Sequence, residues 1–294
     1  MVGDRGWRKA GIILLFILPS FLPLLVFRLL PMVASVGISG LEWNLISAPS
    51  WVGLDNYTGV LTDPAFHRGL RNTLYYIAGY LPLVYLGALS VALLLNRGVR
   101  AIAFFRGLYF LPVLTSWVVV ALLWKWILNP QVGIVNYALS LIGVAGPGWW
   151  TDPAWAMPSI ILASAWKDLG FIMLILLAGL QGISEEMYEA ARVDGASAWQ
   201  RFRHVTMPLL TPATFFVAVL ALIGGFQVFD QVWVMTEGGP AGATTVVMEQ
   251  IYSSAFRYGL MGRAAAMSWV LFAIILGATL LQFRHQRRWV HYAE

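Results

Sequence analysis

The chain has 294 residues, of which 59% are hydrophobic and only 11% are charged. Soluble domains carry roughly 25% charged residues, so this composition excludes a disordered chain, a solvated coiled coil and an ordinary soluble enzyme. The chain contains no cysteine, which excludes disulfides, thiolate metal sites and a cysteine nucleophile. We therefore predict an all-α polytopic membrane protein.

Six apolar runs are long enough to cross a bilayer as helices, which takes about 20 residues each. The first run follows three basic residues, as in a signal peptide, but it is longer than the roughly 7–15 apolar residues of such a peptide. We expect it to be retained as a membrane helix, and we expect residues 1–294 to form a single transmembrane domain. The six predicted spans are residues 10–33, 72–95, 104–128, 156–181, 210–235 and 264–283.

The basic residues predict how the spans are oriented. Twelve of them lie at the two termini and in the second and fourth connections, against four in the other connections. The positive-inside rule then places both termini in the cytoplasm. The basic residues behind the net charge of +5 are placed as membrane topology requires. We therefore expect membrane lipid, and no nucleic acid, as a partner. The twelve residues are Arg5, Arg8, Lys9, Arg97, Arg100, Arg106, Arg192, Arg201, Arg203, Arg284, Arg287 and Arg288.

The connection over 129–155 is rich in turn residues, including Asn129-Pro130 and Gly146-Pro147-Gly148. Its stretch 134–144 is apolar but too short to span a bilayer. We predict a helix there that lies on the outer surface or against the bundle. Trp149-Trp150 is expected at the membrane–water interface, where tryptophan is enriched, or alternatively in contact with a partner protein outside the membrane.

The connection after the fourth run, residues 184–208, has the pattern of two short helices. Ser184 precedes an acidic segment and suits the N-cap of the first helix. Asp194-Gly195 is expected to end that helix, since glycine adopts the left-handed conformation found after many helices. Ser197 and Gln200 fit a capping box that opens the second helix.

Trp199, Phe202 and Val205 give the second helix an apolar stripe, and Pro208 is expected to end it. These residues alone describe an amphipathic connector resting on the lipid surface. The sequence also resembles the EAA motif of permease subunits of ATP-binding-cassette importers, with Met207-Pro208 in place of the usual Leu-Pro. In that family the segment docks as a coupling helix into a cleft on the ATPase subunit. The matching residues are Glu189, Ala190, Ala191, Asp194, Gly195, Ala196, Phe202 and Pro208.

The resemblance extends over most of the chain. It points to the maltose and glycerol-3-phosphate branch of these permeases, and to a member similar to the larger maltose-permease subunit. It implies six transmembrane helices in the type I ABC importer permease fold. The segments that are similar to sugar-type permeases are residues 51–57, 72–73, 123–130, 166–171, 178–181 and 236–240.

The resemblance also implies an assembly in the cytoplasmic (inner) membrane of a bacterium or archaeon. Its other parts are a second homologous permease, two cytoplasmic ATPase subunits and an extracytoplasmic solute-binding protein. ATP and Mg are expected in the ATPase subunits, because this chain has no G-x-x-x-x-G-K-[ST] phosphate loop. We expect no cofactor, metal or catalytic residue in this chain. The implied function is import of a sugar, polyol or related solute by ATP-driven alternating access, with Glu189 and Gly195 in the coupling.

Polar side chains at membrane depth are costly and mark candidate functional sites. Lys167 and Asp168 are adjacent, so on a helix they point about 100° apart. Gln227 and Gln231 are four residues apart and are expected on one helix face. By resemblance, these parts of the fourth and fifth spans line the sugar pocket, although Lys167 and Asp168 can instead bond to neighbouring helices or to a partner subunit. The pocket candidates are Ser164, Lys167, Asp168, Phe171, Phe226, Gln227 and Asp230.

Three other functions stay open. The first is import of glycerol-3-phosphate or a glycerophosphodiester, which Lys167 favours. The second is a membrane enzyme, which the histidines disfavour because all of them lie outside the apolar runs. The third is half of an ion-coupled secondary transporter with Lys167, Asp168 and Asp230 in a proton or ion relay. The EAA segment disfavours this function, because such a carrier has no ATPase to bind. The histidines are His67, His204, His285 and His291.

Overall fold

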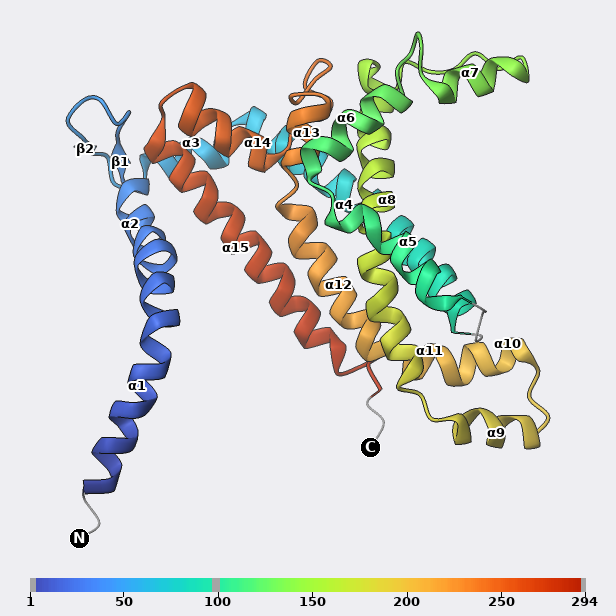
Figure 1. Cartoon of the computed structure of the whole chain (residues 1–294). Helices are drawn as coiled ribbons and strands as arrows, with labels where there is room; N and C mark the ends of the chain where they lie inside the picture. Colours follow the sequence, from blue (N-terminus) through green and yellow to red (C-terminus); the bar gives the residue numbers. More distant parts are fainter. Residues whose placement is uncertain (1–3, 97–100, 292–294) are drawn as a thin grey trace. The chain divides into compact units, whose positions relative to one another are not determined.

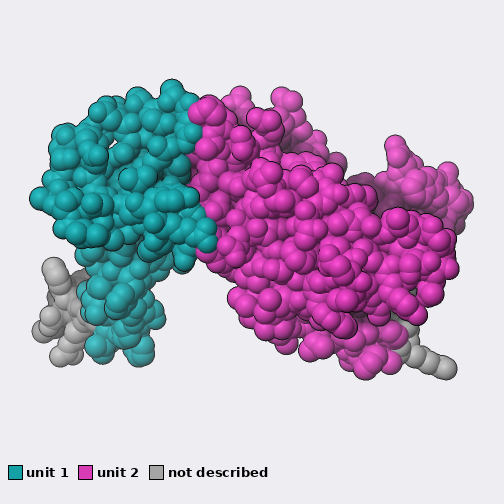
Figure 2. All heavy atoms as spheres, turned by 90° about the horizontal axis from the view of Figure 1, so that it is seen from above, with its two compact units in different colours: residues 1–63, 251–270 teal, residues 64–250, 271–294 magenta. Residues whose placement is uncertain are grey.

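The computed structural model describes residues 4–96 and 101–291, and helices make up most of it (Figure 1). The chain forms two compact units (Figure 2). The first unit consists of residues 1–63 and 251–270, and the second of residues 64–250 and 271–294. Helix α15 (Met261–Gln286) contributes residues to both.

The first unit begins with a long helix that continues past three prolines. Pro19 and Pro23 lie inside its first part, and Pro31 lies in the first turn of its last part. A proline removes one backbone donor and crowds the preceding turn, and the helix widens to a π turn between Pro23 and Pro31. Every residue from 12 to 34 is exposed, which suits a helix surrounded by lipid tails. The three parts are α1 (Asp4–Leu24), the π-helical turn η1 (Leu25–Leu29) and α2 (Leu30–Ser39).

A short antiparallel hairpin and a short helix follow in the first unit. Leu41 lies opposite Trp51 in the hairpin. Asn56 Nδ2 donates to the carbonyl oxygens of Ser39 and Leu41, at 2.9 Å each, which ties the helix to the hairpin. The elements are β1 (Leu41–Glu42), β2 (Ser50–Trp51), α3 (Asp55–Thr62) and the π-helical turn η4 (Ser253–Arg257).

The second unit is built on the packed pair α4 and α8. Tyr76 of α4 and Met173 of α8 are both almost completely buried. Helix α5 packs closely on α8 because Gly170 has no side chain: a Cβ atom there would overlap the Tyr109 carbonyl. Helix α12 packs on α4 and α8. The longer helices of this unit are α4 (Pro64–Leu95), α5 (Ile102–Leu114), α6 (Trp117–Ile127), α8 (Pro153–Gln181) and α12 (Thr211–Phe226).

Shorter elements connect these helices. The helix predicted within 134–144 is confirmed as α7, and the two helices predicted within 184–208 are confirmed as α9 and α10. The shorter elements are α7 (Ile134–Leu141), the 3-10 turn η2 (Trp149–Thr151), α9 (Glu185–Val193), α10 (Ala198–Arg201), the π-helical turn η3 (Phe202–Thr206), α11 (Met207–Leu209), α13 (Asp230–Met235) and α14 (Val247–Tyr252).

Four helices within the described residues are long and apolar enough to cross a membrane. Two further helix pairs, each bent at a break, raise the number to six if each pair counts as one span. The four helices are Ile12–Ser39, Pro64–Leu95, Pro153–Gln181 and Met261–Gln286.

The predicted span 104–128 is not one straight helix. It consists of α5 and α6, which meet at 99°. Pro112 lies in the last turn of α5, where it weakens continuation of the helix. Ser116 then caps α6, with its hydroxyl accepting from the Val119 amide at 3.4 Å. Hydropathy alone does not reveal this bend, because α5 and α6 are both apolar.

The predicted span 210–235 is also interrupted. Helix α12 ends at Phe226, directly after Gly224-Gly225, and α13 begins only at Asp230. Glycine costs a helix about 1 kcal/mol relative to alanine, so the glycine pair weakens this end. The expectation that Gln227 and Gln231 share one helix face is therefore wrong.

Candidate functional site

Asp168 of α8 is held by a tyrosine of the neighbouring α4. Tyr80 Oη donates to Asp168 Oδ2 at 2.8 Å. Tyr80 also stacks on Tyr76, with ring centroids 5.2 Å apart. Residues four apart lie on one face of a helix, so α4 presents both rings on the same side. This hydrogen bond joins α8 to α4 and fixes the position of Asp168.

A buried amide extends this cluster to α13. Gln231 Nε2 donates to Tyr76 Oη at 3.3 Å and to Ser164 Oγ at 3.4 Å. Ser164 is fully buried and donates in turn to the Ile160 carbonyl at 2.8 Å. A buried polar group without a partner costs about 1–3 kcal/mol. The bonds of Gln231 therefore favour one placement of α13 against α4 and α8.

Two adjoining hollows lie beside Asp168, and we refer to them together as the Asp168 cavity. Their volumes are about 200 and 190 Å³. Among the described residues that line them there is no lysine or arginine. Both hollows are lined by Tyr80, Asp168, Leu220, Ala221 and Gly224. The first is also lined by Tyr76, Trp117, Gln227, Val228, Phe229, Asp230 and Gln231, and the second by Phe171, Ile172, Ile175 and Val217.

Lys167 is directed elsewhere than its neighbour Asp168. Its Nζ donates to the Val113 carbonyl at 3.1 Å and lies 5.0 Å from the centroid of the Trp117 ring. Only 6% of Lys167 is exposed, so its ammonium group requires such partners. The two adjacent residues thus contact different helices, in agreement with the angle expected between them.

The 184–208 loop contains the predicted turn between its two helices. Gly195 follows α9 with φ of +77°. The predicted capping box is formed, with the Gln200 amide 3.3 Å from Ser197 Oγ and the Ser197 amide 2.7 Å from Gln200 Oε1. Ser184 occupies the predicted N-cap position of α9, although its side chain makes no cap bond.

Pro208 does not end the second helix, contrary to prediction. The chain passes from α10 into the π turn η3, in which the Met207 amide bonds to the Phe202 carbonyl. Pro208 then lies in the first turn of α11, where a missing amide donor costs little. The chain bends by 60° between this segment and α12.

The 184–208 loop exposes charged and apolar side chains together. The side chain of Glu189 is 65% exposed and lies 3.7 Å from Arg192, which is closer to Glu185, at 2.9 Å. Exposed ion pairs contribute at most about 1 kcal/mol, so this pairing does not prevent Glu189 from binding another protein. Trp199 and Val193 are also strongly exposed, although both are apolar.

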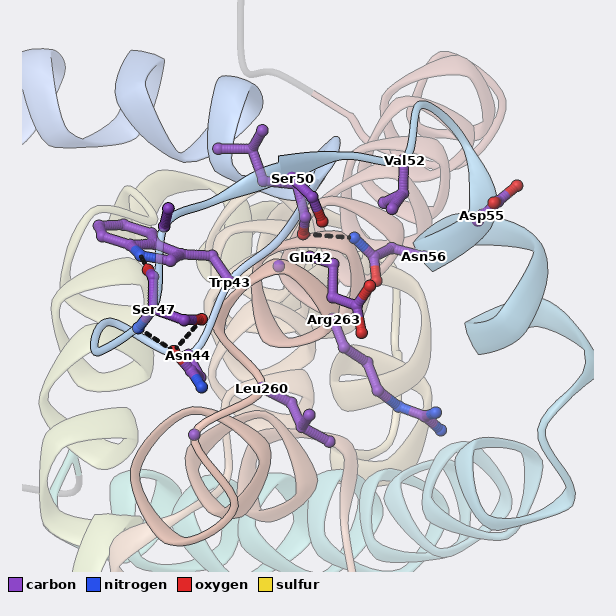
Figure 3. Close-up of a pocket in the computed structure, with 14 residues that line it drawn as sticks. Glu42, Trp43, Asn44, Ser47, Ser50, Val52, Asp55, Asn56, Leu260 and Arg263 are labelled. Atoms are coloured by element: carbon purple, nitrogen blue, oxygen red, sulfur yellow. Dashed lines mark hydrogen bonds between the residues drawn. The ribbon is translucent and has the colours of Figure 1, made fainter.

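A larger hollow, of about 630 Å³, lies within the first unit (Figure 3). The hairpin, the start of α3 and residues 259–263 line it. Asn44 Oδ1 accepts from the amides of Ile46 and Ser47 at 3.0 and 2.8 Å, and Trp43 Nε1 donates to the Ser47 carbonyl at 3.0 Å. These bonds determine the shape of the hairpin tip.

Comparison with known proteins identifies the family. The model of the family described as binding-protein-dependent transport system inner membrane component matches residues 84–291. The chain belongs to this family. The matched range includes α8, the 184–208 loop and every described element after it.

Relatives along nearly the whole length are permease subunits of ATP-binding-cassette transporters. The permease is 35% identical to the lactose transport system permease protein LacF of Rhizobium radiobacter, over 95% of this chain and 93% of that protein. It is 34% identical to the trehalose/maltose transport system permease protein MalF of Thermococcus litoralis, over 95% and 94%. A probable permease of Bacillus subtilis, YesP, is 37% identical over 94% and 91%.

The fold is that of a solved importer. A chain in the crystal structure of a bacterial ABC transporter that imports the acidic polysaccharide alginate is 26% identical, with a TM-score of 0.84. The match covers 97% of the permease and 99% of that chain. The predicted all-α membrane architecture and the type I ABC importer permease fold are confirmed.

The structure places the seven pocket candidates in three settings. Asp168, Gln227 and Asp230 line the first hollow, and Phe171 lines the second. Ser164 belongs to the buried cluster around Gln231. The remaining two, Lys167 and Phe226, are buried and line neither hollow.

Sequence reasoning missed the aromatic lining of the Asp168 cavity. Tyr76, Tyr80 and Trp117 line it, but they were not among the candidates. The available signal was the spacing of Tyr76 and Tyr80, two hydroxyl-bearing rings four residues apart in the uncharged second run. No local signal shows that they face Asp168.

The eight residues that match the EAA motif lie together in the 184–208 loop. Three are on α9, three form its end and the following turn, Phe202 begins η3, and Pro208 is in α11. The loop is tied internally by Tyr188 Oη and Thr206 Oγ1, 3.1 Å apart.

Proposed function

We propose that this permease imports a neutral, hydroxyl-rich solute, a sugar or polyol, through the Asp168 cavity. The lining of that cavity carries the proposal. It combines carboxylates and amides, which accept from and donate to hydroxyl groups, with aromatic faces that pack on the apolar side of a sugar ring. The relatives named for lactose and for trehalose and maltose support a sugar. The polar lining residues are Tyr76, Tyr80, Asp168, Gln227, Asp230 and Gln231.

A phosphorylated solute is less well supported. A phosphate group calls for arginine, lysine or a cluster of amide donors. Lys167, the basic residue next to Asp168, donates to the Val113 carbonyl. The described lining contains no lysine or arginine, and Asp168 and Asp230 would repel a phosphate. Glycerol-3-phosphate therefore stays a second candidate only.

Each of the two hollows that form the Asp168 cavity is smaller than a typical ligand pocket. Ligand pockets occupy roughly 300–1,000 Å³, whereas the two hollows measure about 200 and 190 Å³. We infer that a second homologous permease completes the site. We also infer that the site widens as the helices rock between outward-open and inward-open states.

The driving force in this proposal comes from two partner ATPases that hold ATP and Mg. Each ATPase closes on ATP and pushes a coupling helix, here α9 to η3, with Glu189 and Gly195 central to the contact. A solute-binding protein delivers the ligand on the opposite side, as the family name indicates. The chain itself hydrolyses nothing in this scheme.

The permease is an inner membrane component by family. We propose a bacterial or archaeal cytoplasmic membrane with both termini inside, on the strength of the basic residues in the connections. Arg97 and Arg100, two of the residues behind this orientation, lie outside the described residues.

The test begins with the cognate solute-binding protein. Thermal shift against maltose, trehalose, lactose and glycerol-3-phosphate selects the ligand, and ATP-dependent uptake of that ligand follows in vesicles that contain the whole transporter. We expect a neutral sugar to raise the melting temperature and to be taken up. A shift with glycerol-3-phosphate alone would contradict the neutral assignment.

A further inference from the structure

Helix α7 presents an apolar stripe that no described residue covers. Ile134, Tyr137 and Leu141 are 58%, 64% and 70% exposed, and Ala138 between them is exposed as well. These positions follow the i, i+3, i+4, i+7 spacing of one helix face. We call these four residues the α7 stripe. Ile142, 73% exposed, directly continues it.

We infer that the α7 stripe inserts into the lipid interface, on the side of the membrane opposite the 184–208 loop. The side follows from connectivity, because α7 precedes the span α8 and the loop follows that span. The inference is independent of which solute the permease carries.

The charge distribution favours lipid over a water-soluble protein as the occupant. Residues 126–151 contain no Asp, Glu, Lys or Arg, although Lys125 and Asp152 bound them. A docking surface for a soluble protein has a polar rim around its apolar centre, and this segment offers no charged side chain to such a rim. An uncharged segment with exposed aromatic rings is typical of the membrane–water interface.

Asn136, a polar residue of α7, bonds to the loops on both sides of the helix. Asn136 Nδ2 donates to the carbonyls of Pro130 and Pro147, at 3.0 and 3.2 Å. Asn136 Oδ1 accepts from Trp149 Nε1 at 2.6 Å. On a helix Asn136 points away from the α7 stripe. A segment that contacts lipid must satisfy its polar groups internally, and Asn136 does this for both flanking loops.

The α7 stripe continues a face of α6 that is also apolar and exposed. Val118, Val119, Leu122 and Trp126 are all more than half exposed. Trp126 lines the same hollow, of about 530 Å³, as Ile134 and Tyr137. The exposed faces of the two helices therefore meet, and lipid that covers one of them also covers the other.

The permease has no cysteine of its own, so single cysteines can be introduced and labelled with a nitroxide. Leu141→Cys and Ile142→Cys report on the apolar face, and Ser140→Cys reports on a position about 100° away from Leu141. Val193→Cys is the matched control: it is apolar and 87% exposed, but it ends the charged helix α9. The full-length chain is reconstituted in vesicles of phosphatidylethanolamine and phosphatidylglycerol.

Collision of the nitroxide with oxygen, which concentrates in lipid, is compared with collision with a water-soluble nickel chelate. We expect nitroxides at Leu141 and Ile142 to collide more with oxygen than with the chelate, at a depth of about 5–10 Å in the headgroup–acyl boundary. The nitroxide at Ser140 should lie less deep. The nitroxide at Val193 should collide more with the nickel chelate. Adding the partner subunits should leave the α7 values unchanged.

Nickel access at Leu141 and Ile142 equal to that at Val193 would overturn the inference, because the α7 stripe would then face water. Low access to both reagents would overturn it as well, because a protein would then cover the stripe. If that protection arises only when the partner subunits are added, the occupant is one of those subunits.

Discussion

The Asp168 cavity and the 184–208 loop use polar side chains in opposite ways. In the cavity, Asp168 and Gln231 bond to side chains from other helices. In the loop, Glu189 is exposed and pairs only loosely with a residue of its own helix. These cavity contacts are made within this chain, whereas the role that we propose for the loop requires a partner. Substitutions in the cavity should act on the permease itself, and those in the loop should act only on the assembly.

The largest effect is expected at the cavity. Asp168→Ala should abolish ATP-dependent uptake while the transporter still assembles, as measured by tracer uptake in vesicles and by co-purification of the subunits. The Tyr80 hydroxyl would lose its acceptor, at a cost of about 1–3 kcal/mol. Gln227→Ala should also abolish uptake, but with little change in stability because Gln227 is exposed.

Asp168→Asn is the matched control for this prediction. The asparagine side chain keeps an acceptor for Tyr80 and has nearly the same shape. The melting temperature of this variant should return to that of the unchanged permease. Its uptake should recover only if transport does not require the negative charge of Asp168. Normal uptake in both alanine variants would remove the Asp168 cavity as the solute site.

An effect almost as large is expected in the loop, with a different signature. Gly195→Val places a β-branched side chain at φ of +77°, a conformation that costs an L-residue roughly 1–2 kcal/mol. The turn between α9 and α10 should deform. Binding-protein docking should persist, while ATP hydrolysis becomes uncoupled from uptake.

The control for Gly195 separates backbone conformation from side-chain volume. Apart from its two chain neighbours, no described residue has a heavy atom within 4 Å of the position that a Cβ would occupy there. Asparagine tolerates the left-handed conformation, so Gly195→Asn should keep coupling. Retained coupling in Gly195→Val, measured as uptake per ATP hydrolysed, would count against a role for this turn.

The loop was more predictable from sequence than the cavity, for a physical reason. The capping box joins Ser197 to Gln200, and the left-handed turn depends on Gly195 alone, so both are local. The bond from Tyr80 to Asp168 joins residues 88 positions apart, and no spacing rule reveals it. Hydropathy located the apolar segments of the four long helices and of the bent helix pairs. It did not reveal the breaks within 104–128 and 210–235.

Polar residues at membrane depth were correctly recognised as unusual, but their directions were not predictable. Lys167 and Asp168 are neighbours in sequence and similar in cost of burial. Whether each faces the cavity depends on where α4 and α5 pack. The 100° angle between them predicts only that the two side chains point in different directions.

A smaller effect is expected from Gln231→Leu. Its two hydrogen bonds are long, at 3.3 and 3.4 Å, and an ordinary hydrogen bond contributes about 0.5–1.5 kcal/mol. The variant should melt at a lower temperature and transport at a reduced rate, because α13 is held less firmly against α4 and α8. Unchanged melting would show that the cluster does not position α13.

The smallest effect on the chain itself is expected from Glu189→Gln. Exposed substitutions usually change stability by less than about 0.5 kcal/mol, and the Arg192 contact is 3.7 Å long. The isolated permease should therefore melt normally, while its affinity for the ATPase subunits falls.

Glu185→Gln is the matched control, because Glu185 is the closer partner of Arg192, at 2.9 Å, and lies outside the EAA-like residues. If the two variants weaken ATPase binding equally, general acidity of α9 explains the effect. If only Glu189→Gln does so, a basic group on the ATPase recognises that one carboxylate.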